Sequence, residues 1–401
     1  MLKLGPATLV AAAFIGPGTV VTASVAGASY GYAFVWALAF AIIATMILQE
    51  MSARVGVVTQ RGLGENLRTV IERPSLRIPF YILVIAAVVI GNAAYQGGNL
   101  TGASIGAEGL LGSHPFQFNL WAIVIGLIAV IVLWQGKYKT VERTLIGLVM
   151  LMSVAFLITF FLTRPDLMAL LRGFVPRIPD GGAFTMMALI GTTIVPYALF
   201  LHADSARERW QHTETKQALQ EARQDIATSI PIGGLITLAI LSTSASAFFA
   251  HQLTIQGPAD LAQSIEPVFG RFAGMLMGAG LFAAGISSAI TAPLASAYAL
   301  TGILGWSREL NGKGFRTVWM GIILIGVALS SLQIQPLTLI LFAQVTNGLL
   351  LPLIALFLLL AVNHRSMGQY RNNQKQNLLG LLVFLFACLL CARTLWFTLL
   401  A

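Results

Sequence analysis

Long apolar runs separated by short polar loops fill almost the whole chain. Most of these runs are long enough to cross a bilayer as helices. The third and eighth are long enough to require tilt, a kink or an extension past the bilayer. The pattern predicts an all-α polytopic membrane protein, with a single transmembrane domain over 1–401 and eleven transmembrane helices. The eleven runs cover about 7–29, 33–51, 78–110, 119–134, 144–163, 184–206, 225–250, 271–304, 317–331, 337–362 and 377–399.

Two of these runs contain residues that interrupt a helix. The first run carries Gly16–Thr19, with a proline between two glycines, and the sixth carries Gly191–Pro196. Proline removes a backbone donor and glycine weakens the helix, so a break is expected at each segment. Unpaired backbone groups survive inside a bilayer only where they line a cavity or a substrate site. The two breaks therefore predict a transport site.

The breaks fall at matching positions of two halves of the chain, each of which contains five apolar runs. This arrangement predicts a LeuT-type fold made of two inverted five-helix repeats with broken helices 1 and 6. The first repeat covers about 1–163 and the second about 183–362. The run at about 377–399 is then an extra helix 11 outside the repeats.

The charges of this chain lie mainly between the apolar runs. The chain is 57% hydrophobic and 10% charged, with a formal net charge of +9. If the N-terminus is cytoplasmic, nineteen Lys and Arg residues fall on the inner side and five on the outer side. This bias predicts a cytoplasmic N-terminus and an outer C-terminus, in a bacterial plasma (inner) membrane. The basic residues thus indicate orientation and give no sign of a nucleic-acid partner.

Two smaller features have ordinary structural interpretations. The basic loop from Arg54 to Arg77 is expected to lie against anionic headgroups. Cys388 and Cys391 form a C-x-x-C pair inside the last apolar run, where we expect inert, lipid-facing thiols. No acid–base or nucleophile constellation and no cofactor motif is visible, so the sequence predicts a protein that is not an enzyme.

The polar residues near the two breaks are neutral. A bare divalent ion would be desolvated there with no anion to offset the cost. Mg²⁺, which keeps its water most firmly, suits a neutral site better than a transition metal does. The same donors and the helix N-termini could instead hold an anion or a small neutral solute. The candidate site residues are Thr19, Gln96, Asn99, Thr192, Thr193, Tyr197 and Gln344.

Several of these residues also have a purely structural interpretation. Gln96, Asn99 and Gln344 could serve as amides that hydrogen-bond between helices. His202 could be a satisfied interior histidine near Asp204. The three glycines at four-residue spacing in the third run are expected to form a close helix-packing face rather than a site. These are Gly98, Gly102 and Gly106.

Three short segments resemble one family of transporters. The stretch Gln49–Thr59 is similar to the most typical cytoplasmic segment of the Nramp family of divalent-metal transporters. Phe200–Ala203 resembles the sixth helix of that family, and Gln344–Val345 its tenth. The resemblance covers nearly the whole chain and implies a secondary transporter or facilitator that works by alternating access. It implies a substrate site at Gly16, Thr19, Thr192, Val195, Tyr197 and Gln344, and a pathway through Gln96, Asn99 and His202.

The chain departs from the family pattern at the site itself. Gly16 stands where the family has aspartate, and Thr19 where it has asparagine. Val195 and Tyr197 replace the usual methionine and the first histidine of the sixth helix. In the third helix, amides stand at both positions that usually carry acids.

These departures are similar to those of the Nramp-related magnesium transporters. The resemblance therefore implies transport of hydrated Mg²⁺ without obligatory proton coupling. A small anion or neutral solute, or a transport-dead sensor, is the alternative. The expected partners are a small inorganic ion or solute and the lipid bilayer, and the sequence leaves the oligomeric state open.

Overall fold

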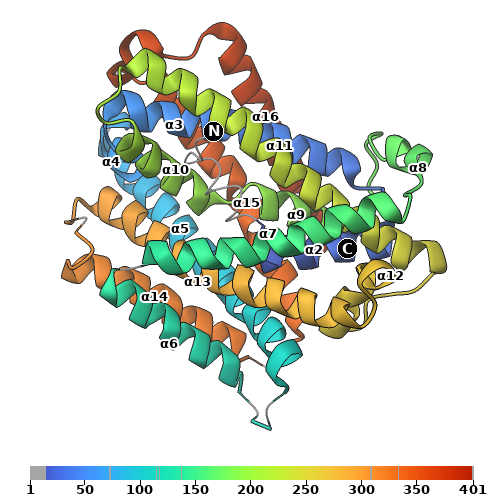
Figure 1. The fold of residues 1–401 in the computed structure, drawn as a ribbon. Helices are drawn as coiled ribbons and strands as arrows, with labels where there is room; N and C mark the ends of the chain where they lie inside the picture. The colour runs from blue at the N-terminus through green and yellow to red at the C-terminus, as the bar shows by residue number, and fades with distance from the viewer. Residues whose placement is uncertain are drawn as a thin grey trace.

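The computed structural model describes residues 15–71, 74–113, 115–116, 118–136, 138–307, 309–332 and 334–399. The first half of the first apolar run, about 7–14, lies outside these residues. All regular structure in the described ranges is helical (Figure 1). The longer helices are α2 (Pro17–Tyr30), α3 (Val35–Thr59), α5 (Pro74–Leu111), α6 (Leu120–Gln135), α7 (Tyr138–Leu162), α9 (Ala183–Thr193), α10 (Pro196–Arg209), α11 (Thr215–Ala247), α13 (Ala273–Leu304), α14 (Lys313–Ser330), α15 (Pro336–Asn363) and α16 (Gln374–Leu399).

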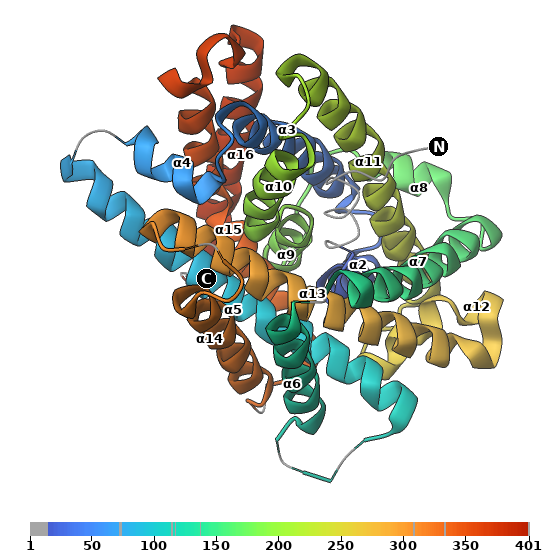
Figure 2. The same cartoon turned by 60° about the vertical axis from the view of Figure 1, so that its left-hand side comes forward.

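The observed helices follow the predicted runs closely. Nine helices in the described residues are long and apolar enough to cross a membrane, and α6 is a shorter apolar helix. The class of fold is therefore confirmed, while the full count of eleven spans stays a prediction. Short helices cover the connections, with α4 (Leu63–Val70) at one end of the molecule (Figures 1 and 2). At the opposite end lie α8 (Leu167–Arg172) and α12 (Glu266–Phe269).

The predicted break of the sixth run is confirmed. α9 ends at Thr193, Ile194 and Val195 have non-helical backbone, and α10 starts at Pro196. Proline fits the first helical position because the amide it lacks would be unpaired there anyway. In the first run, Gly16 has an extended backbone (φ −88°, ψ −179°) and α2 starts at Pro17 in the same way.

Helices at corresponding positions of the two predicted halves pack against each other. α3 contacts α11, α5 contacts α13, and α6 contacts α14. The second halves of the two broken helices are also placed alike, since α2 packs on α11 and α10 packs on α3. The second half of each broken helix thus packs on the helix that follows the other break. This is the pattern expected of two related five-helix units.

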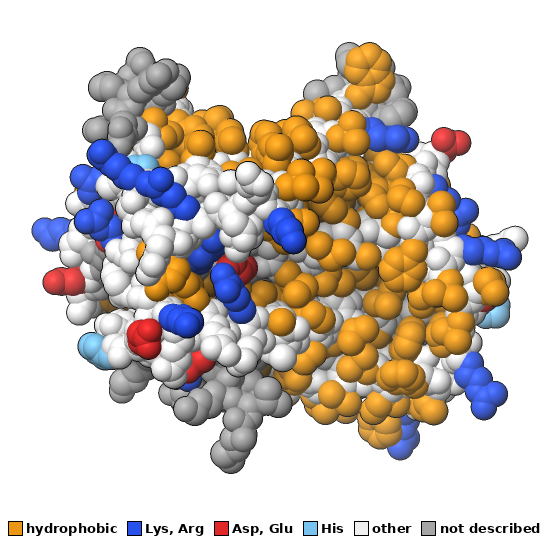
Figure 3. All heavy atoms as spheres, turned by 90° about the horizontal axis from the view of Figure 1, so that it is seen from above, with side chains coloured by type: hydrophobic (Ala, Val, Ile, Leu, Met, Phe, Trp, Pro, Cys, Tyr) orange, Lys and Arg blue, Asp and Glu red, His pale blue; other side chains and the backbone are white. Residues whose placement is uncertain are grey.

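Large apolar side chains remain exposed on the outer face of the helices. Examples are Ile82 and Ile90 on α5 and Leu385 and Leu389 on α16, each more than half exposed. Figure 3 shows such side chains gathered in a broad hydrophobic area, beside a more polar area where many Lys and Arg side chains lie. An uncovered apolar surface of this kind belongs against lipid.

Two expectations from the sequence are wrong. Arg54 does not lie in a loop against headgroups, because α3 continues to Thr59 and buries the Arg54 side chain. Cys391 does not face lipid, because its Sγ lies 3.5 Å from the Gly348 carbonyl oxygen of α15. Both errors arise because length and hydropathy place a helix but do not fix which face another helix covers.

Candidate functional site

The two broken helices meet through their threonines. The Thr19 and Thr192 hydroxyl oxygens are 2.9 Å apart, which joins α2 to α9. The two residues are 1% and 0% exposed, respectively. The neighbouring Thr193 hydroxyl instead donates to the Leu189 carbonyl oxygen of its own helix, at 3.0 Å. Thr19 and Thr192 therefore face each other across the junction, whereas Thr193 is engaged in its own helix.

Gln344 on α15 lies against both breaks. A Cβ atom at Gly18 would come within 2.6 Å of the Gln344 carboxamide carbon, so a larger residue there would require the Gln344 side chain to move. At Gly191, a Cβ atom would meet the main-chain oxygen of Gln344. The Gln344 side chain is fully buried, and neither amide atom has a hydrogen-bond partner among the described residues. A buried amide without a partner costs about 1–3 kcal/mol.

The amides of α5 stand beside this junction. Asn99 is fully buried, and both atoms of its carboxamide lack a partner in the described part of the chain. Gln96 is partly satisfied, because its Nε2 donates to the Ala289 carbonyl oxygen of α13 at 3.1 Å. Its Oε1 has no such partner within the same ranges. Gln96 thus joins two helices, as its structural interpretation predicts, whereas Asn99 does not.

The glycines of α5 form the close packing face that the sequence predicts. A Cβ atom at Gly98 would lie 3.0 Å from the Ala343 Cβ atom of α15. At Gly102 it would meet the Pro17 ring at the start of α2, and at Gly106 the main chain of α13. These contacts bring α5 close to α2, α13 and α15, and so position Asn99 next to the breaks.

The other predicted site residues are Tyr197, Gly16 and Val195, and each is already engaged in contacts within the protein. Tyr197 is buried, and its ring centroid lies 5.2 Å from that of Tyr95 on α5. The main-chain oxygens of Gly16 and Val195 accept hydrogen bonds from the first turns of α2 and α10. Each of these two carbonyl groups therefore already accepts a main-chain hydrogen bond.

His202 is not a satisfied interior histidine in the described structure. Its ring is fully buried on α10, and neither nitrogen has a hydrogen-bond partner among the described residues. Asp204 does not pair with it; a carboxylate oxygen of Asp204 instead lies 3.9 Å from Arg207. Among the described residues, the histidine therefore has no paired carboxylate that would favour its charged form.

One polar residue at this place was not predicted. Asn347 lies one helical turn after Gln344, is fully buried, and has no partner for either amide atom in the described ranges. The signal was present in the sequence, because a second amide three residues after Gln344 falls on the same helix face. Asn347 lies within an apolar run whose length and hydropathy predict only a membrane span, so it was not singled out.

The chemistry of the junction is thus neutral and rich in hydrogen-bonding groups. Hydroxyls come from Thr19 and Thr192, and amides without a partner in the described residues come from Asn99, Gln344 and, one turn farther along α15, Asn347. In the described residues, no three His, Cys, Asp or Glu side chains are grouped so that they could hold a metal ion. The arrangement can exchange hydrogen bonds with a polar guest but offers no anionic ligand.

The family model described as "Natural resistance-associated macrophage protein-like" (Nramp) matches residues 7–397. The chain belongs to the Nramp family. Two curated Nramp relatives carry the name "Divalent metal cation transporter MntH". The protein from Aeromonas hydrophila is 28% identical over 386 residues, covering 95% of this chain and 92% of the relative. The protein from Yersinia pestis is also 28% identical, over 95% and 91%.

Solved structures share the fold of this Nramp chain. A manganese transporter from Eremococcus coleocola superposes with a TM-score of 0.78 at 21% identity, covering 98% of this chain and 85% of the other. MhsT, solved in complex with L-phenylalanine, gives a TM-score of 0.64 at 16% identity, over 98% and 97%. The predicted LeuT-type fold is thereby confirmed. The chain is an integral membrane transporter and not an enzyme.

Proposed function

We propose that this Nramp chain carries a divalent cation across the membrane by alternating access, and that the cation is Mg²⁺ with most of its water retained. The relatives named as divalent metal cation transporters support the class of substrate. The observation that carries the choice of ion is the neutral junction of Thr19, Thr192 and the Asn99 and Gln344 amides, which have no partner among the described residues.

The choice of Mg²⁺ follows from hydration. Amide and hydroxyl oxygens accept hydrogen bonds from metal-bound water, and a retained water shell avoids most of the cost of desolvating the ion. Gly16 and Val195 supply no carboxylate or thioether, so Mn²⁺ and Cd²⁺ lose the ligands they favour. The partners are thus the hydrated ion and the bilayer.

The proposed transport has no obligatory coupling to protons. Gln96 and Asn99 are amides and do not titrate. His202 is buried and has no acidic partner in the described residues. The membrane potential supplies the driving force instead, at about 2.3 kcal/mol per charge per 100 mV, hence about 4.6 kcal/mol for a divalent ion.

The proposed orientation places the N-terminus in the cytoplasm and the C-terminus outside a bacterial plasma membrane. It rests on the distribution of Lys and Arg between the two sides. The two proposed inverted repeats cover about 1–163 and 183–362, and 377–399 lies outside them. The contacts of α3 with α11 and of α5 with α13 support this division.

Purified protein in liposomes is expected to take up Mg²⁺ at a rate that rises with an inside-negative potential. Uptake should proceed without a pH gradient and without acidifying the lumen, because the pathway amides Gln96 and Asn99 do not titrate and His202 has no acidic partner in the described residues. A fluorescent Mg²⁺ indicator and a lumenal pH dye measure the two fluxes. Empty liposomes and liposomes with heat-denatured protein are the controls.

Three results would contradict the proposal in distinct ways. Mg²⁺-dependent proton entry that disappears in His202→Ala would show that transport is coupled to protons through His202. Flux of a small anion or neutral solute without Mg²⁺ flux would assign the amides as donors to that solute. Saturable binding without any flux would indicate a sensor.

Replacing Thr192 with leucine is expected to lower Mg²⁺ uptake by about tenfold, equivalent to 1.4 kcal/mol. The change removes a hydroxyl that faces Thr19 and fills the space between the two breaks. Thr192→Ser keeps the hydroxyl and is the matched control, for which near-normal uptake is expected. Equal uptake by the leucine and serine variants, at equal thermal stability, would remove Thr192 from the site.

A further inference from the structure

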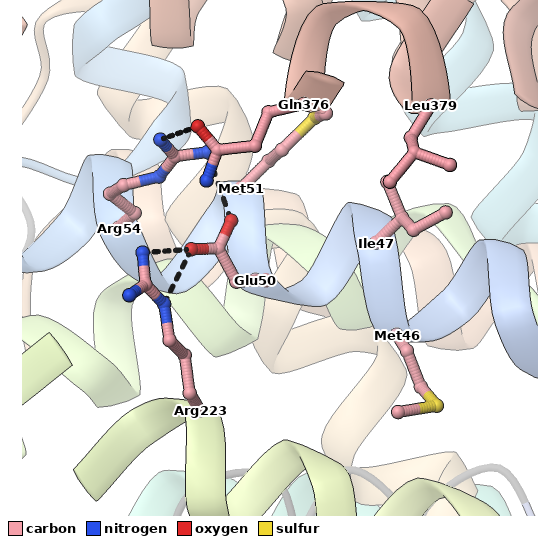
Figure 4. Close-up of a pocket in the computed structure, with 8 residues that line it drawn as sticks. All are labelled: Met46, Ile47, Glu50, Met51, Arg54, Arg223, Gln376 and Leu379. Carbon is pink, nitrogen blue, oxygen red and sulfur yellow. Dashed lines mark hydrogen bonds and ion pairs between the residues drawn. The ribbon is translucent and has the colours of Figure 1, made fainter. Parts of the chain in front are cut away.

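A pocket outside the transport site lies between α3, α11 and α16. Figure 4 shows the residues that line it, and its volume is about 260 Å³. Three helices from distant parts of the sequence supply its walls. The lining residues are Met46, Ile47, Glu50, Met51 and Arg54 of α3, Arg223 of α11, and Gln376 and Leu379 of α16.

One carboxylate in this pocket is shared by two guanidinium groups. Arg54 donates from Nη2 to Glu50 Oε2 at 2.9 Å, and Arg223 donates from Nε and Nη2 to Glu50 Oε1, both at 3.0 Å (Figure 4). Arg54 also donates to the Asn372 side chain at 2.6 Å and to the Tyr370 carbonyl oxygen at 3.2 Å. Glu50 therefore neutralises only one of the two positive charges.

The excess charge is accessible at Arg223. Its side chain is 53% exposed, whereas that of Arg54 is 3% exposed. Arg223 also borders a second, open hollow of about 480 Å³ along the exposed face of α11. The other described residues of this hollow are Lys216, Gln220, Gln224 and Ala227.

This face of α11 is basic and carries no acid. At about 100° per residue, Arg223 lies within about 20° of Lys216 around the helix axis. Glu221 and Asp225 lie about 140° and 180° from Lys216, on the other side of the helix. Glu221 is held there by the Trp210 indole at 2.8 Å. Lys216 and Arg223 thus both line the hollow on α11. The nearby carboxylate of Glu50 is already shared between Arg54 and Arg223 and does not neutralise the charge of Lys216.

The other wall of the pocket is apolar and continues into the bilayer-facing surface. Met46, Ile47 and Leu379 line it beside the charged cluster. Farther along the same helices, exposed apolar side chains follow, each more than half exposed. They are Ile43 of α3, Ile232 and Leu235 of α11, and Leu382 of α16. At about 1.5 Å per residue, Ile232 lies about 13 Å along α11 from Arg223.

We propose that an anionic phospholipid binds here, with its phosphate at Arg223 and Lys216 and an acyl chain along Met46, Ile47 and Leu379. Arginine suits phosphate oxygens because its donors are planar, and beside the Nε–Nη2 edge that holds Glu50 the guanidinium group of Arg223 has a second edge at Nη1. A free phosphate ion would use the charges but leave the apolar wall exposed, and a neutral lipid would leave the net charge uncompensated. An anionic lipid both compensates the positive charge and covers the apolar wall.

Native mass spectrometry of the detergent-purified protein with added phosphatidylglycerol or phosphatidylcholine tests the site. We expect preferential retention of phosphatidylglycerol, and about a 30-fold loss of apparent affinity in Lys216→Gln/Arg223→Gln, at about fivefold per removed charge. Glu50 keeps its pair with Arg54 in this variant, so the fold is expected to persist. The control Arg209→Gln/Lys313→Gln removes the same charge elsewhere on the described surface and should retain the lipid.

A second variant separates lipid from free phosphate. Leu379→Trp leaves every charge in place but fills the apolar wall, and is expected to weaken retention of phosphatidylglycerol. Millimolar inorganic phosphate should not displace the lipid. Equal retention of the two lipids, equal loss in the control double variant, or displacement by inorganic phosphate would overturn the proposal. These measurements need no transport, so they stand apart from the Mg²⁺ assignment.

Discussion

The double variant Gly16→Asp/Thr19→Asn is expected to bind Mn²⁺ about 100-fold more tightly than the unaltered chain, a gain of about 2.7 kcal/mol. The unaltered junction offers only neutral groups, and a carboxylate supplies the missing anionic ligand. The backbone at position 16 suits aspartate, because Gly16 has φ −88° and ψ −179° and precedes α2 as its N-cap. Aspartate is among the preferred residues at that position.

The matched control for this change is Gly16→Asn/Thr19→Asn. It places an amide of similar size at position 16 without the charge, so little gain in Mn²⁺ affinity is expected. Isothermal titration calorimetry on both purified variants measures the difference. The prediction fails if the unaltered chain already binds Mn²⁺ at micromolar concentration, or if the asparagine control gains as much as the aspartate variant. The new carboxylate in the aspartate variant should also hold Mg²⁺ more tightly. Mg²⁺ uptake by this variant should then be slower, because the ion leaves the site less readily.

Replacing Gly191 with alanine is expected to destabilise the protein by about 1–3 kcal/mol and to abolish most uptake. A Cβ atom at this position would meet the Gln344 main-chain oxygen and come within 2.6 Å of the Gly348 nitrogen. Both are backbone atoms of α15, which cannot rotate away as a side chain could. α9 and α15 must therefore separate, and Gln344 moves away from the two breaks.

Gly321→Ala is the control for this prediction. Gly321 also lies within a membrane helix, α14, but a Cβ atom there would meet nothing within 4 Å in the described structure. Alanine has the higher helix propensity, so this variant is expected to keep or raise the thermal stability. Thermal unfolding in detergent and Mg²⁺ uptake in liposomes measure both variants. Equal melting temperatures for the two would show that the α9–α15 contact is looser than the structure indicates.

The sequence predicted the helices because membrane helices obey a simple constraint. A segment in lipid must satisfy its own backbone, so length and hydropathy locate the span. The breaks could be predicted because Pro17 and Pro196 lack the amide that would continue a preceding helix and suit the first position of a new one. Thr19 and Thr192 could be named as site residues from their position beside those prolines, and the structure brings them to 2.9 Å.

Only the tertiary structure decided which polar groups are used by the protein and which are left over. Gln96 and Asn99 lie three residues apart on α5, yet Gln96 bonds to α13 and Asn99 has no described partner. Asn347 was missed, and Arg54 was placed in a loop, because each depends on the helix packed against it. Membrane helix packing is set by close contacts of small residues, such as Gly18 against Gln344, and a single sequence does not reveal which partner meets each glycine.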